Sequence, residues 1–170
     1  MSAPTPRPLR LGCVMEQVLG HVSWSQQLER ALAGRAGVET RVVKTALYRD
    51  GGLPERLPLP SYVQGGLRGL LDTRAGLRGW RPDVLLFNTQ KPAIFCQPTL
   101  LRTPTLLMTD VTPRDYDAMA SDYEHRPDRG PITRLKHVVN ALNFRLAAAV
   151  VPWSRWAARS LVNDYGVPAE

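Results

Sequence analysis

Five short apolar runs divide the chain into segments of similar length. They cover residues 9–15, 40–45, 83–87, 105–109 and 147–152, and each is apolar almost throughout rather than alternating. Strands that are buried on both faces have this pattern, and such strands form parallel sheets. The runs therefore predict five strands of one mainly parallel sheet.

Helical patterns lie between most of these runs. Residues 22–33 repeat an apolar side chain at every fourth position, and residues 154–165 follow Ser154, a good N-cap, and end at Gly166. A further helix is predicted over residues 131–147, with one apolar stripe formed by Ile132, Leu135, Val138, Val139, Leu142 and Leu146. The alternation of strands and helices predicts an α/β fold: a Rossmann-like, doubly wound, mainly parallel sheet with helices on both faces.

Residues 51–79 differ in composition from the rest of the chain. They contain seven of the 13 glycines together with three prolines, and a partial helical stripe of leucines. We interpret them as a loop followed by a weak helix, and the composition suggests a mobile flap.

The length of 170 residues and the 44% hydrophobic content are those of one folded domain. Residues 1–8 are rich in proline and have no apolar core, which predicts a disordered lead-in rather than a secretory signal. No apolar run reaches the length of about 20 residues that a membrane-spanning helix needs. We therefore expect a single domain over residues 9–170 and a cytoplasmic protein.

The net charge of +7 comes from 22 basic and 15 acidic residues, and 19 of the basic residues are arginine. This excess either reflects base composition or serves an anionic partner, since guanidinium groups bind phosphate and carboxylate. The basic residues are scattered and accompany no recognised motif, so we expect no nucleic-acid partner.

Cys13 and Cys96 lie in apolar surroundings, which indicates buried reduced thiols. We expect no metal and no cofactor.

Polar residues follow the ends of four predicted strands, where ligands bind in open α/β sheets. The candidate substrate-binding residues are Gly20, His21, Asn88, Gln90, Thr112, Tyr116, Asp117, His125 and Ser154. No GxGxxG or GxxxxGK[ST] motif occurs, which argues against dinucleotide-binding and P-loop domains. Because these side chains come from separate loops of one sheet edge, they predict a single binding cleft.

Several of these residues also have purely structural explanations. Gly20 can serve a turn and His21 can be a structural or surface histidine, although backbone N–H groups at this helix start favour a bound anion. Thr112 has the pattern of a helix N-cap. Asp110 is either an Asx-turn residue or a carboxylate directed into the cleft. Trp153 and Trp156 can pack or stack.

Three segments resemble the N-terminal half of a GT-B type glycosyltransferase, closest to glycosyltransferase family 4 and its group 1 relatives. The first is the strand that leads through Gly20 and His21 into a helix. The second runs from Leu106 to Pro113 and continues through Tyr116, Asp117 and the Tyr123–His125 stretch. The third comprises residues 150–154 and 160–168.

The resemblance implies the acceptor-side domain of a retaining enzyme that transfers a sugar from a nucleoside-diphosphate sugar to a sugar or lipid-linked acceptor. Gly20 and His21 would face the donor phosphates, and Asp110 would be the catalytic group where many members have a histidine. The donor-binding C-terminal domain of such enzymes would follow residue 170, and without it we expect little or no activity.

Two other interpretations stay open. The chain can be a non-catalytic α/β module that binds a small ligand or a protein. Independently, Arg134, Lys136, His137 and Arg145 lie on the polar side of the 131–147 helix, which is either a solvated face or a peripheral contact with an anionic inner-membrane surface.

Overall fold

The sheet is five-stranded and entirely parallel. A computed structural model describes residues 7–46, 52–121 and 130–169 of the chain. Its strands are β1 (Leu9–Glu16), β2 (Val38–Thr45), β3 (Val84–Phe87), β4 (Thr105–Thr109) and β5 (Ala149–Pro152), in the order β2-β1-β3-β4-β5. All five predicted strands are confirmed, with ends that differ by at most two residues.

Helices connect the strands as the alternation predicts. They are α1 (Gly20–Leu32), the 3-10 turn η1 (Pro54–Arg56), α2 (Ser61–Gly76), α3 (Gln97–Leu100), α4 (Pro113–Ala118), α5 (Pro131–Leu146) and α6 (Arg155–Tyr165). Thr112 and Ser154 are N-caps whose hydroxyls accept from the backbone N–H of Asp115 and Ala157. Gly166 ends α6 in the left-handed conformation (φ 64°). The Ser154 cap and this glycine confirm the two predicted boundaries of the helix.

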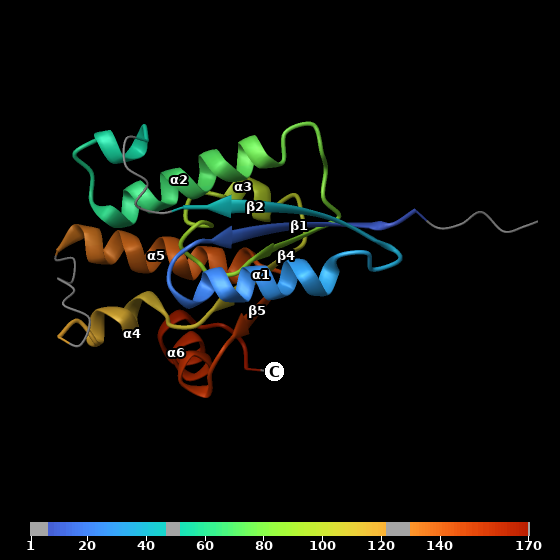
Figure 1. Cartoon of the computed structure of the whole chain (residues 1–170). Coiled ribbons are helices and arrows are strands. Elements are labelled where there is room, and N and C mark those ends of the chain that lie inside the picture. Colours follow the sequence, from blue (N-terminus) through green and yellow to red (C-terminus); the bar gives the residue numbers. More distant parts are fainter. Residues whose placement is uncertain (1–6, 47–51, 122–129, 170) are drawn as a thin grey trace, which may run out of the picture.

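The strand order places a topological switch point between β1 and β3. From β1 the chain moves to β2 on one side and returns to β3 on the other, so the connections diverge there. The arrowheads of β1 and β2 point toward the side of the molecule where α4 and the start of α5 lie (Figure 1). The carboxyl ends of the strands and these helix ends therefore share one edge of the domain.

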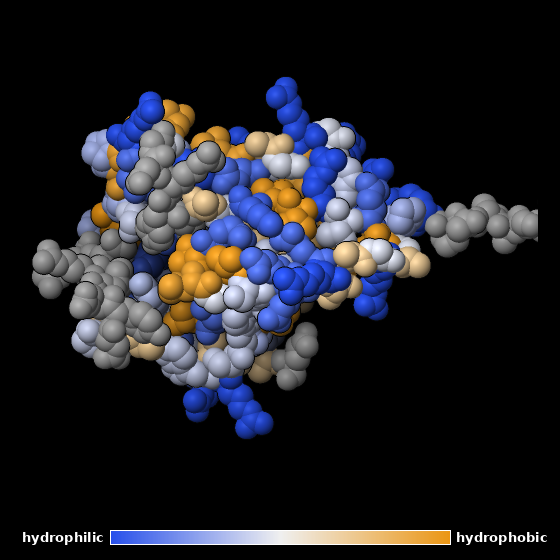
Figure 2. Space-filling view, viewed as in Figure 1, coloured by the Kyte–Doolittle hydropathy of each residue, from blue (hydrophilic) through white to orange (hydrophobic). Residues whose placement is uncertain are grey.

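The core is built from side chains of the strands and of the helices that cover them. Val14, Leu85, Phe87 and Leu107 are fully buried at its centre. Burial raises the pKa of Cys13 to about 12 and that of Cys96 to about 11, so both are buried thiols, as predicted. On the face that carries α1, apolar side chains form separate patches among hydrophilic ones (Figure 2). None of the helices in the described ranges has the length and apolarity to span a bilayer.

The glycines of α2 are packing contacts. A Cβ on Gly69 would lie 2.3 Å from the carbonyl oxygen of Pro92, and a Cβ on Gly76 would lie 2.5 Å from a methyl group of Val43. Gly66 approaches the side chain of Ile94 in the same way. The predicted weak helix is thus a packed helix of 16 residues, and its glycines permit close approach to a loop and a strand.

Most of the apolar stripe predicted on α5 is exposed, although Leu146 at its end packs against the core. Leu135 and Val138 are both 54% exposed, whereas Lys136, Asn140 and Asn143 are buried. Asn143 donates to the backbone carbonyls of Ala93 (3.0 Å) and Ile94 (3.4 Å) and accepts from Gln97 (2.8 Å). This helix covers an irregular loop, whose buried carbonyls need hydrogen-bond donors, and polar side chains supply them.

Two further expectations concern the predicted lead-in over residues 1–8 and the predicted polar side of α5. Arg7 lies in the predicted lead-in, but its guanidinium forms an ion pair with Asp83 (2.8 Å) beside the start of β3. Lys136 belongs to the side of α5 predicted to meet solvent or a membrane surface, but it is buried in an ion pair. Residues 1–6 are not among those the structure describes.

Candidate functional site

The switch point is held together by a buried polar cluster. The side-chain oxygen of Asn88 accepts from the backbone N–H of Glu16 (2.7 Å), and its amide nitrogen donates to the Glu16 carbonyl (3.3 Å). The hydroxyl of Thr89 donates to the Glu16 carboxylate. These bonds tie the end of β1 to the end of β3, and Asn88 itself is fully buried. Asn88 therefore lies beneath the edge and fixes its shape.

His21 and Asp110 meet above this cluster. The Nε2 atom of His21, in the first turn of α1, lies 3.4 Å from a carboxylate oxygen of Asp110, which directly follows β4. The His21 side chain is 13% exposed and the Asp110 side chain 39%. Asp110 also accepts from the backbone N–H of Val111 (2.9 Å), so it serves both as a turn residue and as a carboxylate at the edge.

The pair shifts both pKa values. The hydrogen bond to Asp110 raises the pKa of His21, against the effect of burial, and the charges of Asp110 and Glu16 add to the increase. Burial raises the pKa of the Asp110 carboxyl, but its hydrogen bonds and the His21 charge outweigh burial, and the net shift is downward. Each group thus stabilises the charged form of the other.

An aromatic wall supports His21. Trp153 follows β5, and its ring centroid lies 5.1 Å from that of His21, with the two rings tilted by 59°. The ring centroids of Trp24 and Trp153 are 5.7 Å apart. Trp153 remains 40% exposed, so it both packs against His21 and presents a surface at the edge. Before α1, Leu19 has φ 48° and is 86% exposed. This strained backbone lies two residues before His21, and such outliers are common at functional sites.

The pair predicts a defined pH dependence of stability. Because the folded-state pKa of His21 is raised, its contribution is complete below the ordinary value of 6.5 and is lost as the pH rises through the raised pKa. The lowered pKa of Asp110 gives a contribution that is complete above 3.8 and is lost as the pH falls through the lowered pKa. We expect the stability difference between the wild type and Asp110→Asn, measured by urea unfolding, to be largest between these two values. A difference that grows toward alkaline pH would contradict the pairing.

The neighbouring loops are joined by hydrogen bonds. Gln90, after β3, donates to the carbonyl of Val111 (3.0 Å). Its own side-chain carbonyl oxygen is buried and has no hydrogen-bond partner among the residues that the structure describes. The Thr112 hydroxyl lies 2.8 Å from that of Ser160 on α6. The loops after β3 and β4 and helix α6 are therefore linked by hydrogen bonds, and the Thr112–Ser160 contact is buried.

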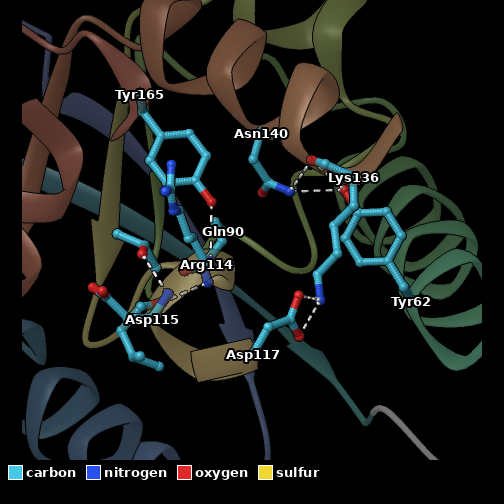
Figure 3. A network of polar contacts seen from close by, with 10 residues as sticks. Tyr62, Gln90, Arg114, Asp115, Asp117, Lys136, Asn140 and Tyr165 are labelled. Atoms are coloured by element: carbon cyan, nitrogen blue, oxygen red, sulfur yellow. Dashed lines mark hydrogen bonds and ion pairs between the residues drawn. The ribbon is translucent and has the colours of Figure 1, made fainter. Parts of the chain in front are cut away.

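A second polar network joins α4, α5 and α2 (Figure 3). The Lys136 ammonium contacts both carboxylate oxygens of Asp117, at 2.8 and 2.9 Å. The side chains of Lys136 and Asp117 are 9% and 18% exposed, so the ion pair is largely buried. Asn140 donates to the Tyr62 hydroxyl (2.8 Å), and the Lys136 ammonium lies 5.8 Å from the Tyr62 ring centroid. Asp117 thus anchors the short helix α4 to the two longer helices.

Removing this carboxylate is expected to destabilise the fold. Asp117→Asn leaves the Lys136 ammonium largely buried but removes the carboxylate whose two oxygens it contacts. Because the loss of one partner of a buried ion pair is costly, the free energy of unfolding should fall by about 3 kcal/mol. The double variant Asp117→Asn, Lys136→Met removes the charge as well and should recover part of that loss. Chemical unfolding measures both. If the double variant were less stable than Asp117→Asn, the pair would not be the origin of the effect.

The structure brings most of the predicted residues to one edge. His21 pairs with Asp110, and a Cβ at Gly20, the first residue of α1, would meet no other atom within 4 Å. Gln90 and Thr112 join the loops to each other and to α6, whereas Asp117 joins α4 to α5. Tyr116 lies in α4, and Ser154 is exposed at the start of α6. His125 lies outside the described residues.

Some residues of these polar networks are not among the predicted site residues. Glu16 is the last residue of β1 and Thr89 is the second residue after β3, so the rule of strand ends could have included them. Tyr62, Lys136 and Asn140 lie inside helices, and no local signal in the sequence marks them as polar partners. Within the described ranges, no group of three or more His, Cys, Asp or Glu side chains could hold a metal ion.

Comparisons with known proteins add little to this geometry. No protein-family model matches the chain, and no curated protein does. Among solved structures, a crystal structure of the glycotransferase of kitacinnamycin matches with 20% identity and a TM-score of 0.45. The match covers 98% of this chain and 43% of that one, so the chain spans less than half of its length. At this identity and TM-score the match carries no functional argument, and the function must be argued from the site.

Proposed function

We propose that this chain is the acceptor-side domain of a retaining GT-B type glycosyltransferase that uses a nucleoside-diphosphate sugar. The observation that carries the proposal is the His21–Asp110 pair, because it places an ionised carboxylate at the carboxyl edge of a parallel sheet, beside the switch point. The resemblance of the surrounding segments to family 4 supports the same assignment. The donor would be held mainly by a further domain of the natural protein.

In this proposal Asp110 acts on the acceptor. Its carboxylate is ionised at neutral pH and 39% exposed, so it can accept a hydrogen bond from an acceptor hydroxyl and orient that hydroxyl toward the sugar. His21 holds the carboxylate in place, and the Trp153 ring limits the movement of His21. The backbone at Gly20, the first residue of α1, would face the donor phosphates, which helix N-termini favour.

The test is sugar transfer by the natural protein that contains this chain. A panel of nucleoside-diphosphate sugars is incubated with hydroxyl acceptors, products are detected by mass spectrometry, and NMR of the product gives the anomeric configuration. We expect transfer with retention, and little or none by the 170-residue chain alone, since catalysis needs both reactants held together. Ligand binding without any transfer by the natural protein would instead favour the non-catalytic binding module.

A further inference from the structure

A basic pocket of about 650 Å³ lies between α4, α5 and α6. Arg114 from α4, Arg134, Lys136 and His137 from α5, and Tyr165 from α6 line it, together with Asp117. Its volume is in the range of small-ligand sites. Because α4 begins three residues after Asp110 and the N-terminus of α5 lies at the same edge, the pocket is on the side of the domain that carries the His21–Asp110 pair (Figure 1).

The charges in the pocket do not cancel. Lys136 and Asp117 neutralise each other through their ion pair. Arg114 pairs with Asp164 (2.9 Å), but its side chain stays 64% exposed. No ion pair of Arg134 occurs among the described residues, and this side chain is exposed. Among the lining side chains that the structure describes, Arg134 is thus a guanidinium that no ion pair offsets.

The other lining residues that the structure describes are uncharged or basic, while the carboxylates of Asp115 and Asp164 lie near Tyr165. Burial raises the pKa of Tyr165 to about 12, so its hydroxyl is neutral, and it accepts from the backbone N–H of Arg114 (3.1 Å). The His137 ring stacks on the Tyr165 ring at 4.9 Å. Gly130, the N-cap of the 16-residue helix α5, lines the pocket, and the dipole of this helix adds positive potential there.

We infer that this pocket binds a phosphate group of the acceptor, carried by a phosphorylated sugar or polyol or by a lipid head group. Guanidinium groups bind phosphate oxygens with two parallel hydrogen bonds, and two of them line the pocket. A phosphate held here would place the remainder of the acceptor along the edge that leads to Asp110. The inference rests on the proposed function and specifies the substrate class of the same edge.

Direct binding to the 170-residue chain tests the inference without any transfer reaction. Glucose 6-phosphate and glucose are titrated separately and followed by NMR, with inorganic phosphate as a third probe. We expect the two phosphates to bind and to shift signals of Arg134 and His137, and glucose to leave them unchanged. Equal behaviour of glucose and glucose 6-phosphate would overturn the inference.

Arg134→Ala should weaken phosphate binding by about tenfold, as expected for the loss of one charge-assisted contact. The matched control is Arg145→Ala, which removes an exposed arginine at the other end of α5, outside the pocket. Arg134→Glu should abolish binding, and thermal unfolding shows that each variant is folded. If Arg145→Ala weakened binding as much as Arg134→Ala, the effect would be one of general charge, and the pocket would not be the site.

Vesicles distinguish the two sources of the phosphate. If the group belongs to a lipid, the chain should bind phosphatidylcholine vesicles that contain phosphatidylglycerol and not pure phosphatidylcholine vesicles, and Arg134→Glu should abolish that binding. If the group belongs to a soluble acceptor, only the sugar phosphate should bind. Binding of neither probe overturns the inference and leaves the proposed transfer untouched, whereas phosphate binding without transfer by the natural protein contradicts only the proposed function.

Discussion

Asp110→Asn is expected to lower sugar transfer by the natural protein by about 100-fold or more, the usual contribution of a positioned acid or base. The substitution keeps the size of the side chain but removes the charge that an acceptor hydroxyl would meet. It also removes the partner that raises the pKa of His21. The rate constant of transfer, measured with saturating donor, reports the effect.

A matched control lies at the opposite edge of the sheet. Asp83 precedes β3 and pairs with Arg7, so Asp83→Asn removes one carboxylate of the same chemical type far along the strand from the site. We expect its transfer rate to equal that of the wild type. His21→Gln should add little to Asp110→Asn in the double variant, because the two residues act as one unit. Unchanged transfer by Asp110→Asn would remove Asp110 from the mechanism.

Gly69→Ala is expected to produce the largest loss of stability, about 3 kcal/mol or more. The added Cβ would lie 2.3, 2.4 and 2.7 Å from the carbonyl oxygen, Cα and carbonyl carbon of Pro92, all of them backbone atoms that cannot rotate away. The gain in helix propensity, about 1 kcal/mol, is smaller than this clash. Urea unfolding measures the difference in free energy.

Gly20→Ala is the matched control for stability. A Cβ at Gly20, the first residue of α1, meets no atom within 4 Å, so the same chemical change should alter the free energy of unfolding by less than about 1 kcal/mol. If Gly69→Ala were as stable as Gly20→Ala, α2 would tolerate a wider separation from the loop that carries Pro92. That loop continues from Gln90, so a shift of Pro92 should also disturb the contact between Gln90 and Val111.

The gathering of polar residues at the carboxyl edge of the sheet could be predicted, because all strands of a parallel sheet end at the same edge. Continuous apolar runs marked the strands, and the residues after them included His21 and Asp110. Local chemistry also marked helix ends at Thr112, Ser154 and Gly166, since caps depend on neighbours in the chain. The contact between His21 and Asp110 depends on two loops that are far apart in sequence, so no local pattern predicts it.

The sequence by itself determined the parallel α/β sheet, the boundaries of several helices and the edge at which polar side chains gather. These depend on hydrophobic periodicity and on capping, both of which act over a few residues. Only the tertiary structure decided which face of α5 is buried. Most of the apolar stripe on this helix is exposed, and three of the four buried side chains of the helix are polar; the fourth is Phe144. Lys136, Asn140 and Asn143 contact a carboxylate, a tyrosine hydroxyl and loop carbonyls from distant segments. Buried polar groups require partners, and the position of those partners is a property of the packed fold.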